Sequence, residues 1–161
     1  MEKNRLKRRN HYSVGVVSDT HGRLRPAVLQ TFEGTDLILH AGDIDHPDIL
    51  AKLRKIAPLI AVRRNMDWGD WANDLRPTEA VQIGAVTIHL LHDLHRLSVD
   101  PHDTGFNVVI SGHTHQPLAR KKNGVLYLNP GSATAPRCGH KASVAVLQIR
   151  GGSFEAQFIW L

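Results

Sequence analysis

The sequence predicts a single α/β domain in which layers of sheet and helix are stacked on one another. From residue 14 onward, short runs rich in β-branched residues alternate with segments of helical pattern, and the early runs end in polar residues or glycine. The chain has 161 residues, 42% of them hydrophobic, which is enough for one full core. No Ser/Gly linker and no repeat divides it. We expect one domain over residues 14–161, preceded by a basic extension at 1–13.

The strands and helices follow from hydrophobic spacing and from the positions of proline. Proline in the first turn and apolar spacing of three to four residues predict helices at Pro26–Phe32 and Pro47–Ile56. Runs bounded by turn residues predict strands at Val14–Ser18, Leu37–Ala41, Leu59–Arg63, Ala80–Ile83, Val86–Leu91, Val108–Ser111, Val125–Leu128, Ser143–Ile149 and Phe154–Trp160. Gly84 and Ala85 separate two of these strands, which therefore form a hairpin. The sheet system is expected to be mixed.

Composition excludes several classes of protein. The apolar runs are too short for a membrane span, and the basic N-terminus is not followed by the apolar stretch of a secretory signal. We therefore expect a cytoplasmic protein. Cys138 is the sole cysteine, so an internal disulfide and a cysteine-based zinc finger are excluded. Most of the net charge of +5 lies in the first ten residues, and this basic tail could contact nucleic acid.

Acidic and histidine side chains directly follow five of the predicted strands. The carboxyl ends of strands converge in layered α/β folds, so these segments are expected to meet in space. Imidazole and carboxylate together suit zinc, manganese, iron or nickel. The five segments are Asp19-Thr20-His21, Gly42-Asp43, Asn65-Met66-Asp67, His92-Asp93 and Gly112-His113-Thr114-His115.

Glycine adjoins the candidate ligands at Gly22, Gly42, Gly112 and Gly131, where the backbone must turn or approach closely. Histidines within predicted strands have another role. We interpret His40 and His89 as residues that satisfy hydrogen bonds of the core.

Taken in order, the segments SDTHG, HAGDID, RRNMD, LLHD, SGHTHQP and LNPGSATAPR resemble the calcineurin-like metallophosphoesterases. The resemblance covers residues 14–161 and is greatest to the small bacterial and archaeal phosphodiesterases. It implies a four-layer α/β/β/α sandwich of two mixed sheets flanked by helices. It also implies a seven-residue centre for two divalent metal ions. Asp19, His21 and His115 would bind one ion, Asn65, His92 and His113 the other, and Asp43 would bridge them.

The chemistry implied by the resemblance is hydrolysis of a small, nucleotide-like phosphodiester by a hydroxide that bridges the two ions. Manganese is the expected metal, with zinc, nickel, iron or magnesium as alternatives. Asp43 and Asn65 are then catalytic as well as metal-binding. The oligomeric state stays open.

Three departures from the family pattern concern residues around the centre. Arg64 replaces the usual glycine and could contact the substrate phosphate. Met66 stands where other branches carry histidine, which leaves the proton donor open. Asp93 replaces a second glycine, and His95 is our candidate for protonating the leaving group.

Other residues are expected to support the ligands or the substrate. Asp67, Asp93 and Asn129 are predicted to hold the ligand loops in place. Trp68 and Trp71 could form a wall for a base or aryl group, or could pack on the domain itself.

Two alternative functions remain open. The retromer scaffold subunit resembles the same fold and acts chiefly through protein contacts, so a non-catalytic scaffold is one. The other is a nuclease that uses the basic tail.

Overall fold

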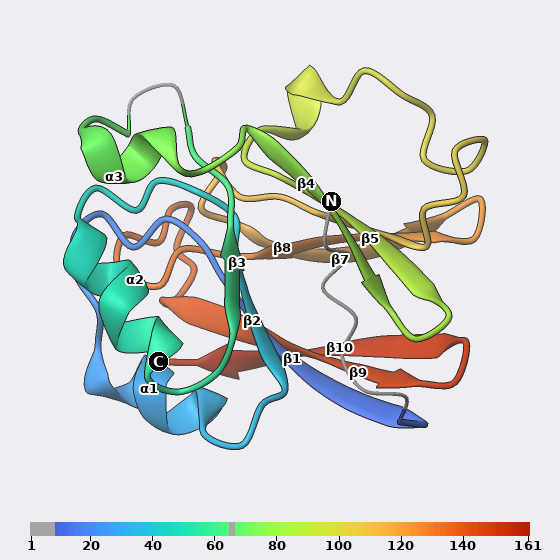
Figure 1. Ribbon diagram of the computed structural model, residues 1–161, viewed down its shortest axis with the longest axis horizontal. Helices are drawn as coiled ribbons and strands as arrows, with labels where there is room; N and C mark the ends of the chain where they lie inside the picture. The colour runs from blue at the N-terminus through green and yellow to red at the C-terminus, as the bar shows by residue number, and fades with distance from the viewer. Residues whose placement is uncertain (1–8, 65–66) are drawn as a thin grey trace.

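The computed structural model of the chain describes residues 9–64 and 67–161. Two five-stranded sheets pack face to face, with helices on the outside (Figure 1). Both sheets are mixed, as the sequence predicts.

The first sheet has the strand order β10-β9-β1-β2-β3. Its strands are β1 (His11–Val17), β2 (Leu37–His40), β3 (Leu59–Ala61), β9 (Ser143–Arg150) and β10 (Ser153–Trp160). Strands β1, β2 and β3 are parallel, while β9 runs antiparallel to both β1 and β10. The three parallel strands therefore share one carboxyl end.

The second sheet has the order β4-β5-β6-β8-β7. Its strands are β4 (Thr78–Ile83), β5 (Val86–Leu91), β6 (Val108–Ile110), β7 (Pro117–Lys122) and β8 (Val125–Pro130). The predicted hairpin is confirmed, because β4 pairs antiparallel with β5 up to the Ile83↔Val86 pair. Strands β5, β6 and β8 are parallel and share a second carboxyl end.

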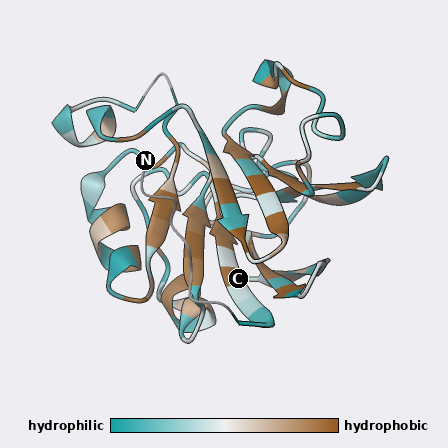
Figure 2. Cartoon of the chain, turned by 45° about the vertical axis from the view of Figure 1, so that its right-hand side comes forward, coloured by the Kyte–Doolittle hydropathy of each residue, from teal (hydrophilic) through white to brown (hydrophobic). Residues whose placement is uncertain are grey.

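The main core fills the space between the two sheets. Alternate residues of each strand point into it, such as Val14 and Val16 of β1 and Val108 and Ile110 of β6, all fully buried. The strands are accordingly the most hydrophobic part of the ribbon in Figure 2. Burial of this shared face fixes the two sheets, and hence their carboxyl ends, relative to each other.

Helices α1 (Pro26–Phe32) and α2 (Pro47–Arg54) cover the outer face of the first sheet. Phe32 and Leu53, both fully buried, pack against Val17 and Ile38 of that face. A one-turn helix, α3 (Asp70–Asn73), follows β3. The outer face of the second sheet is covered by the short 3-10 helix η1 (Leu94–Arg96) and its loop, which pack on Leu91, Val109 and Val125 through leucines.

The predicted fold class is confirmed, with differences in detail. The layer outside the second sheet is thinner than a row of full helices, since η1 is its only helical turn among the described residues. Strand β7 was not predicted, because its exposed Arg120, Lys121 and Lys122 carry no alternation of apolar residues. Such charges protect the edge of a sheet from further pairing. Within the described ranges, no helix has the length and apolar character needed to cross a membrane.

Candidate metal centre

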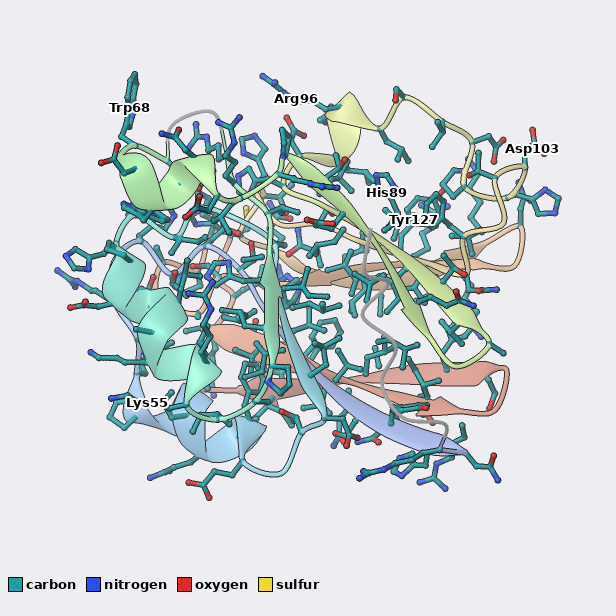
Figure 3. All side chains as sticks on the ribbon, viewed as in Figure 1. Lys55, Trp68, His89, Arg96, Asp103 and Tyr127 are labelled. Atoms are coloured by element: carbon teal, nitrogen blue, oxygen red, sulfur yellow. The ribbon has the colours of Figure 1, made fainter. Side chains whose placement is uncertain are left out.

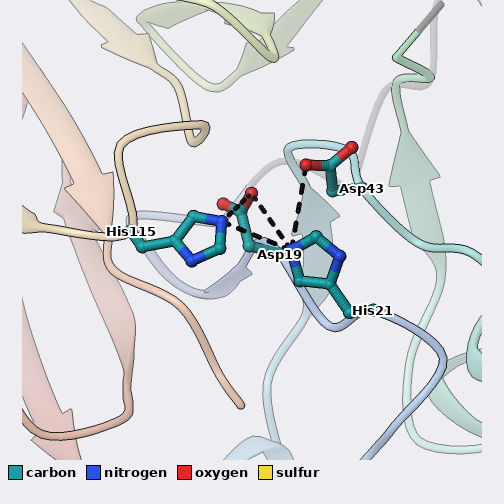
Figure 4. A group of neighbouring side chains, drawn as sticks. All are labelled: Asp19, His21, Asp43 and His115. Atoms are coloured by element: carbon teal, nitrogen blue, oxygen red, sulfur yellow. Dashed lines mark hydrogen bonds and ion pairs between the residues drawn. The ribbon is translucent and has the colours of Figure 1, made fainter. Parts of the chain in front are cut away.

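The candidate ligands lie where the carboxyl ends of the parallel strands meet. Asp19 follows β1, Asp43 follows β2, His92 follows β5, and His113 and His115 follow β6. Ligand atoms of Asp19, His21, Asp43 and His115 lie within 4.8 Å of one another (Figure 4). The structure thus brings together residues nearly a hundred positions apart, as the strand-end argument predicts. The seventh candidate, Asn65, lies outside the described residues, as does Met66.

The backbone of these loops is in an unusual conformation. Left-handed φ values occur at Asp19 (53°), His21 (46°), Asp43 (55°), His113 (73°) and His115 (60°). This region costs a non-glycine residue roughly 1–3 kcal/mol and persists only where its surroundings enforce it. Five of the eight non-glycine residues in this region among the described residues are candidate ligands, which indicates that the loops are held for side-chain placement.

Three histidines are anchored through Nδ1, which leaves Nε2 to face the centre. Nδ1 of His21 lies 3.0 Å from Asp45 Oδ2, and Nδ1 of His92 lies 2.7 Å from the Ala41 carbonyl oxygen. Nδ1 of His115 lies 2.6 Å from the Ala135 carbonyl oxygen. A proton on Nδ1 satisfies each of these contacts, and the free lone pair on Nε2 is then available to a metal ion.

The Nε2 atoms converge on two carboxylates. His115 Nε2 lies 3.2 Å from Asp19 Oδ1, and His21 Nε2 lies 4.0 Å from the same oxygen. Asp43 Oδ2 lies 3.8 Å from His21 Nε2 and 3.4 Å from His92 Nε2. Asp43 is therefore placed between the Asp19 group and His92, the position that a bridging ligand requires.

Two buried atoms at this point have no hydrogen-bond partner within the described residues. They are Asp19 Oδ1 and His92 Nε2. Unpaired buried polar atoms are costly, and a carboxylate oxygen and an imidazole nitrogen are both metal ligands. The donor set therefore fits a divalent cation. The ring of His113 lies edge-on to His92 with centroids 5.2 Å apart, which places it at the same end of the cluster.

The two carboxylates create a negative potential around the histidines. Burial lowers the pKa of His92, but the carboxylates of Asp43 and Asp19 outweigh burial, and the pKa is raised. For His115 the nearby Asp19 carboxylate dominates over burial and raises the pKa. Burial raises the pKa of Asp43, yet His92 and Arg64 more than compensate and hold it well below its usual range. The site therefore favours positive charge.

Arg64 lies directly against the candidate bridging ligand. Its Nη1 is 3.2 Å from both carboxylate oxygens of Asp43. Asp67 is buried and holds this loop, accepting hydrogen bonds from the backbone N–H groups of Arg64 (2.9 Å) and Asp45 (3.2 Å). The arginine guanidinium thus lies directly at the candidate centre.

The loop that carries His113 and His115 is held against Asp19 by hydrogen bonds. Asp19 Oδ2 accepts hydrogen bonds from Ser18 Oγ (2.6 Å) and from the backbone N–H of His113 (3.1 Å). Asn129 donates to the Gly112 carbonyl oxygen (2.9 Å) and to Thr114 Oγ1 (3.0 Å). Asn129 thus contacts the loop that carries His113 and His115, which is the supporting position expected of it.

His40 lies beneath the centre and is fully buried. Its Nδ1 accepts from the Gly42 N–H (3.1 Å), and its Nε2 lies 3.0 Å from Thr20 Oγ1. Only the neutral ring with its proton on Nε2 meets both contacts. Burial accordingly lowers the pKa of His40 to about 4.

The remaining predicted residues lie around the centre or at the surface. Asp93 lines a cavity beside His92 and caps η1 by accepting from the His95 N–H (3.0 Å). The side chain of His95 is exposed, so its role as proton donor stays a prediction. Trp71 packs into the core under the helices, whereas Trp68 is 75% exposed.

Sequence reasoning missed several supporting residues. Asp45 orients His21, and the second Asp of the HAGDID segment was a usable signal for it. Ser132 and Thr134 donate to the Asp19 carbonyl oxygen at 2.8 and 3.2 Å. Both residues belong to the LNPGSATAPR segment, which was a usable signal for them. Arg96, which lines the cavity beside His92, follows no motif.

The fold and the centre define a metal-binding enzyme built on two packed sheets. The sequence pattern of the calcineurin-like phosphoesterase superfamily domain matches residues 12–152, and the chain belongs to this superfamily. It is a metal-dependent phosphoesterase, a hydrolase, as the resemblance predicts.

Proteins similar in sequence carry names that agree with membership of this superfamily. A probable metallophosphoesterase of Methanothermobacter thermautotrophicus is 37% identical over 158 residues, covering 91% of this chain and 91% of the relative. A phosphodiesterase of Methanocaldococcus jannaschii is 25% identical over 154 residues, covering 84% of this chain and 90% of the relative.

Solved structures share the fold. An archaeal phosphodiesterase superposes with a TM-score of 0.76 at 22% identity, covering 91% of this chain and 99% of that one. Vacuolar protein sorting 29 of Cryptosporidium parvum superposes with a TM-score of 0.76 at 19% identity, covering 95% of this chain and 99% of that one. The same architecture thus occurs in proteins named for hydrolysis and for vacuolar protein sorting.

The contact between Gly112 and Asp19 yields the first prediction. A Cβ at Gly112 would overlap Ser18 Oγ and lie 2.6 Å from Asp19 Oδ2. We expect Gly112→Ala to displace the Asp19 carboxylate and to weaken manganese binding by at least roughly tenfold, measured by titration calorimetry. Gly152→Ala is the matched control, because nothing lies within 4 Å of its added Cβ. Wild-type manganese affinity in Gly112→Ala would show that this contact does not position the carboxylate.

The neutral His40 yields a prediction about stability and pH. Its pKa is about 4 in the folded chain against 6.5 in the unfolded one, so the unfolded chain binds more protons between these values. The free energy of unfolding should therefore rise with pH from about 4 to 6.5, by roughly 3 kcal/mol from this residue.

Urea unfolding in the presence of a chelator, at pH 4.5 and pH 7, measures the rise. The pH dependence should be reduced in His40→Gln, and NMR titration of the wild-type ring should show no protonation above about pH 5. An ordinary pKa near 6.5 for His40 would contradict the assignment.

Proposed function

We propose that the chain is a phosphodiesterase with a dinuclear metal centre. Asp19, His21 and His115 hold one ion, Asn65, His92 and His113 hold the other, and Asp43 bridges them. The observation that carries this proposal is the convergence of three histidine Nε2 atoms, each fixed through Nδ1, on the carboxylates of Asp19 and Asp43. The phosphodiesterase named among the relatives supports the substrate class.

The charge of the centre suits an anionic ester. Asp19 and Asp43 are the only carboxylates among the proposed ligands, so two divalent cations leave the centre net positive. Such a pair supplies an acidified water as nucleophile and neutralises the phosphoryl oxygens. No nucleophilic side chain is then required.

The chain's own residues orient and neutralise the substrate. The Asp45 carboxylate and the carbonyl groups of Ala41 and Ala135 keep the three imidazoles in the tautomer that presents Nε2. Arg64, whose guanidinium lies 3.2 Å from Asp43, is placed to donate to a phosphoryl oxygen bound at the centre. We assign leaving-group protonation to His95. Manganese is the proposed metal, because histidine, carboxylate and amide ligands together suit it; zinc, nickel, iron and magnesium are the alternatives.

The scaffold alternative rests on the shared fold alone. Vacuolar protein sorting 29 and this chain are 19% identical, which establishes architecture and no more. The described candidate ligands of this chain are all chemically competent. Ligand atoms of Asp19, His21, Asp43 and His115 lie within 4.8 Å of one another, and His92 Nε2 lies 3.4 Å from Asp43. These features favour hydrolysis over a purely structural role.

Activity toward a generic substrate tests the proposal. Manganese-loaded protein should hydrolyse bis(4-nitrophenyl) phosphate. Asp43→Asn and His92→Ala should each lower kcat by more than about 100-fold, because loss of a ligand exceeds the ~10–100-fold effect of its supporting partners. His102→Ala, which removes an exposed histidine, is the control. Inactivity of the wild type with manganese, zinc, nickel, iron and magnesium alike would refute the proposed function.

A further inference from the structure

A cavity of about 460 Å³ opens beside the candidate metal centre. It touches His92 and His113 but none of Asp19, His21 and His115, so it approaches the centre from one side only. Its volume lies within the range of roughly 300–1,000 Å³ that is typical of small-molecule sites. The cavity is therefore large enough for more of a substrate than the phosphoryl group under attack.

The charged lining of this cavity is strongly basic. Arg63, Arg64 and Arg96 line it, with Asp93 as the one carboxylate among the lining residues. Pro77 and Leu91 supply apolar wall between these groups. Arginine is suited to phosphate recognition because its planar fork donates two parallel hydrogen bonds.

Arg63 is held in place by its surroundings. Its backbone N–H donates to the Arg76 carbonyl oxygen (3.0 Å), and its Nε donates to the Leu75 carbonyl oxygen (3.0 Å). The guanidinium is thus fixed at Nε, and neither terminal nitrogen has a hydrogen-bond partner in the described part of the chain. This is the arrangement of a preorganised anion donor.

Arg64 and Arg96 differ in their charged neighbours. Arg64 contacts Asp43 and so belongs to both the metal centre and the cavity. Arg96 is the last residue of η1 and forms no ion pair within the described ranges. Figure 3 shows it at the end of the molecule opposite Lys55, where the side chain extends from the short helix. Two of the three guanidinium groups therefore have no carboxylate partner among residues 9–64 and 67–161.

We propose that this cavity is a subsite for a second phosphate group of the substrate, bound by Arg63 and Arg96. This inference rests on the proposed function, because the subsite gains its meaning from the adjoining centre. Arg64 and the proposed metal ions already neutralise the phosphoryl group under attack. The two remaining guanidinium groups match the charge of a terminal phosphate, about −1.5 to −2 at neutral pH. The substrate is accordingly a phosphodiester that carries a further phosphate, with its organic part against Pro77 and Leu91.

A matched pair of chromogenic substrates tests the subsite. One is the 4-nitrophenyl ester of thymidine 5′-phosphate, and the other is the same ester with an added 3′-phosphate. Manganese-loaded wild-type protein should give a kcat/KM at least roughly tenfold higher for the phosphorylated ester, mainly through KM.

Arginine variants assign the preference to the cavity. Arg96→Gln and Arg63→Gln should each remove most of the roughly tenfold preference and leave hydrolysis of the unphosphorylated ester largely intact. Arg54→Gln is the matched control for net charge, since Arg54 is exposed in the last turn of α2. Its neighbour in sequence, Lys55, lies at the opposite end of the molecule from Arg96 (Figure 3).

A binding measurement separates this proposal from the proposed function. Adenosine 3′,5′-bisphosphate should bind manganese-loaded protein roughly tenfold more tightly than adenosine 5′-phosphate, and Arg96→Gln should abolish the difference. If neither ester is hydrolysed but this arginine-dependent difference persists, the proposed function fails and the subsite stands. Equal kcat/KM for the two esters together with equal nucleotide affinities overturns the subsite. Preferences that survive in both Arg63→Gln and Arg96→Gln overturn it equally.

Discussion

The buried carboxylate of Asp19 is the constraint on which the rest of the centre depends. The side chain is fully buried, and its two oxygens have different environments. Oδ2 is held by Ser18 Oγ and by the His113 N–H, which ties the loop after β6 to the end of β1. Oδ1 has no hydrogen-bond partner among the described residues and faces His115. A buried carboxylate oxygen without a hydrogen-bond partner is costly, so a cation bound at this point would stabilise the fold.

The same site explains why the ligand loops adopt strained backbone conformations above the apolar core. Left-handed conformations at five candidate ligands carry a cost that packing elsewhere must offset. The apolar layer between the sheets supplies that stabilisation, and His40 links it to the loops above by accepting the Gly42 N–H. Gly42 is needed there because a Cβ would lie 2.8 Å from His92 Nδ1. Core, glycine and ligand are thus parts of one packed unit.

Much of this arrangement was predictable because it follows from periodicity and from strand ends. Short β-branched runs predicted β1 and β6, and polar residues directly after them predicted the centre. Strand β7 was missed because its charged residues form no such apolar run, and α3 was missed because one helical turn has too little pattern to detect. Arg63 and Arg96 could not be assigned, since their shared position at one cavity depends on how two sheets pack. Sequence spacing made His95 the candidate proton donor, whereas the residue that lines the cavity is its neighbour Arg96.

Anomalous diffraction from manganese-loaded crystals tests most directly whether the buried carboxylates hold two cations. We expect two anomalous peaks, one contacting Asp19 and His115 and the other contacting His92 and His113, with Asp43 touching both. A single peak, or peaks away from these side chains, would contradict the dinuclear centre. Absence of any peak at Asp19 would contradict the electrostatic argument on which the centre is built.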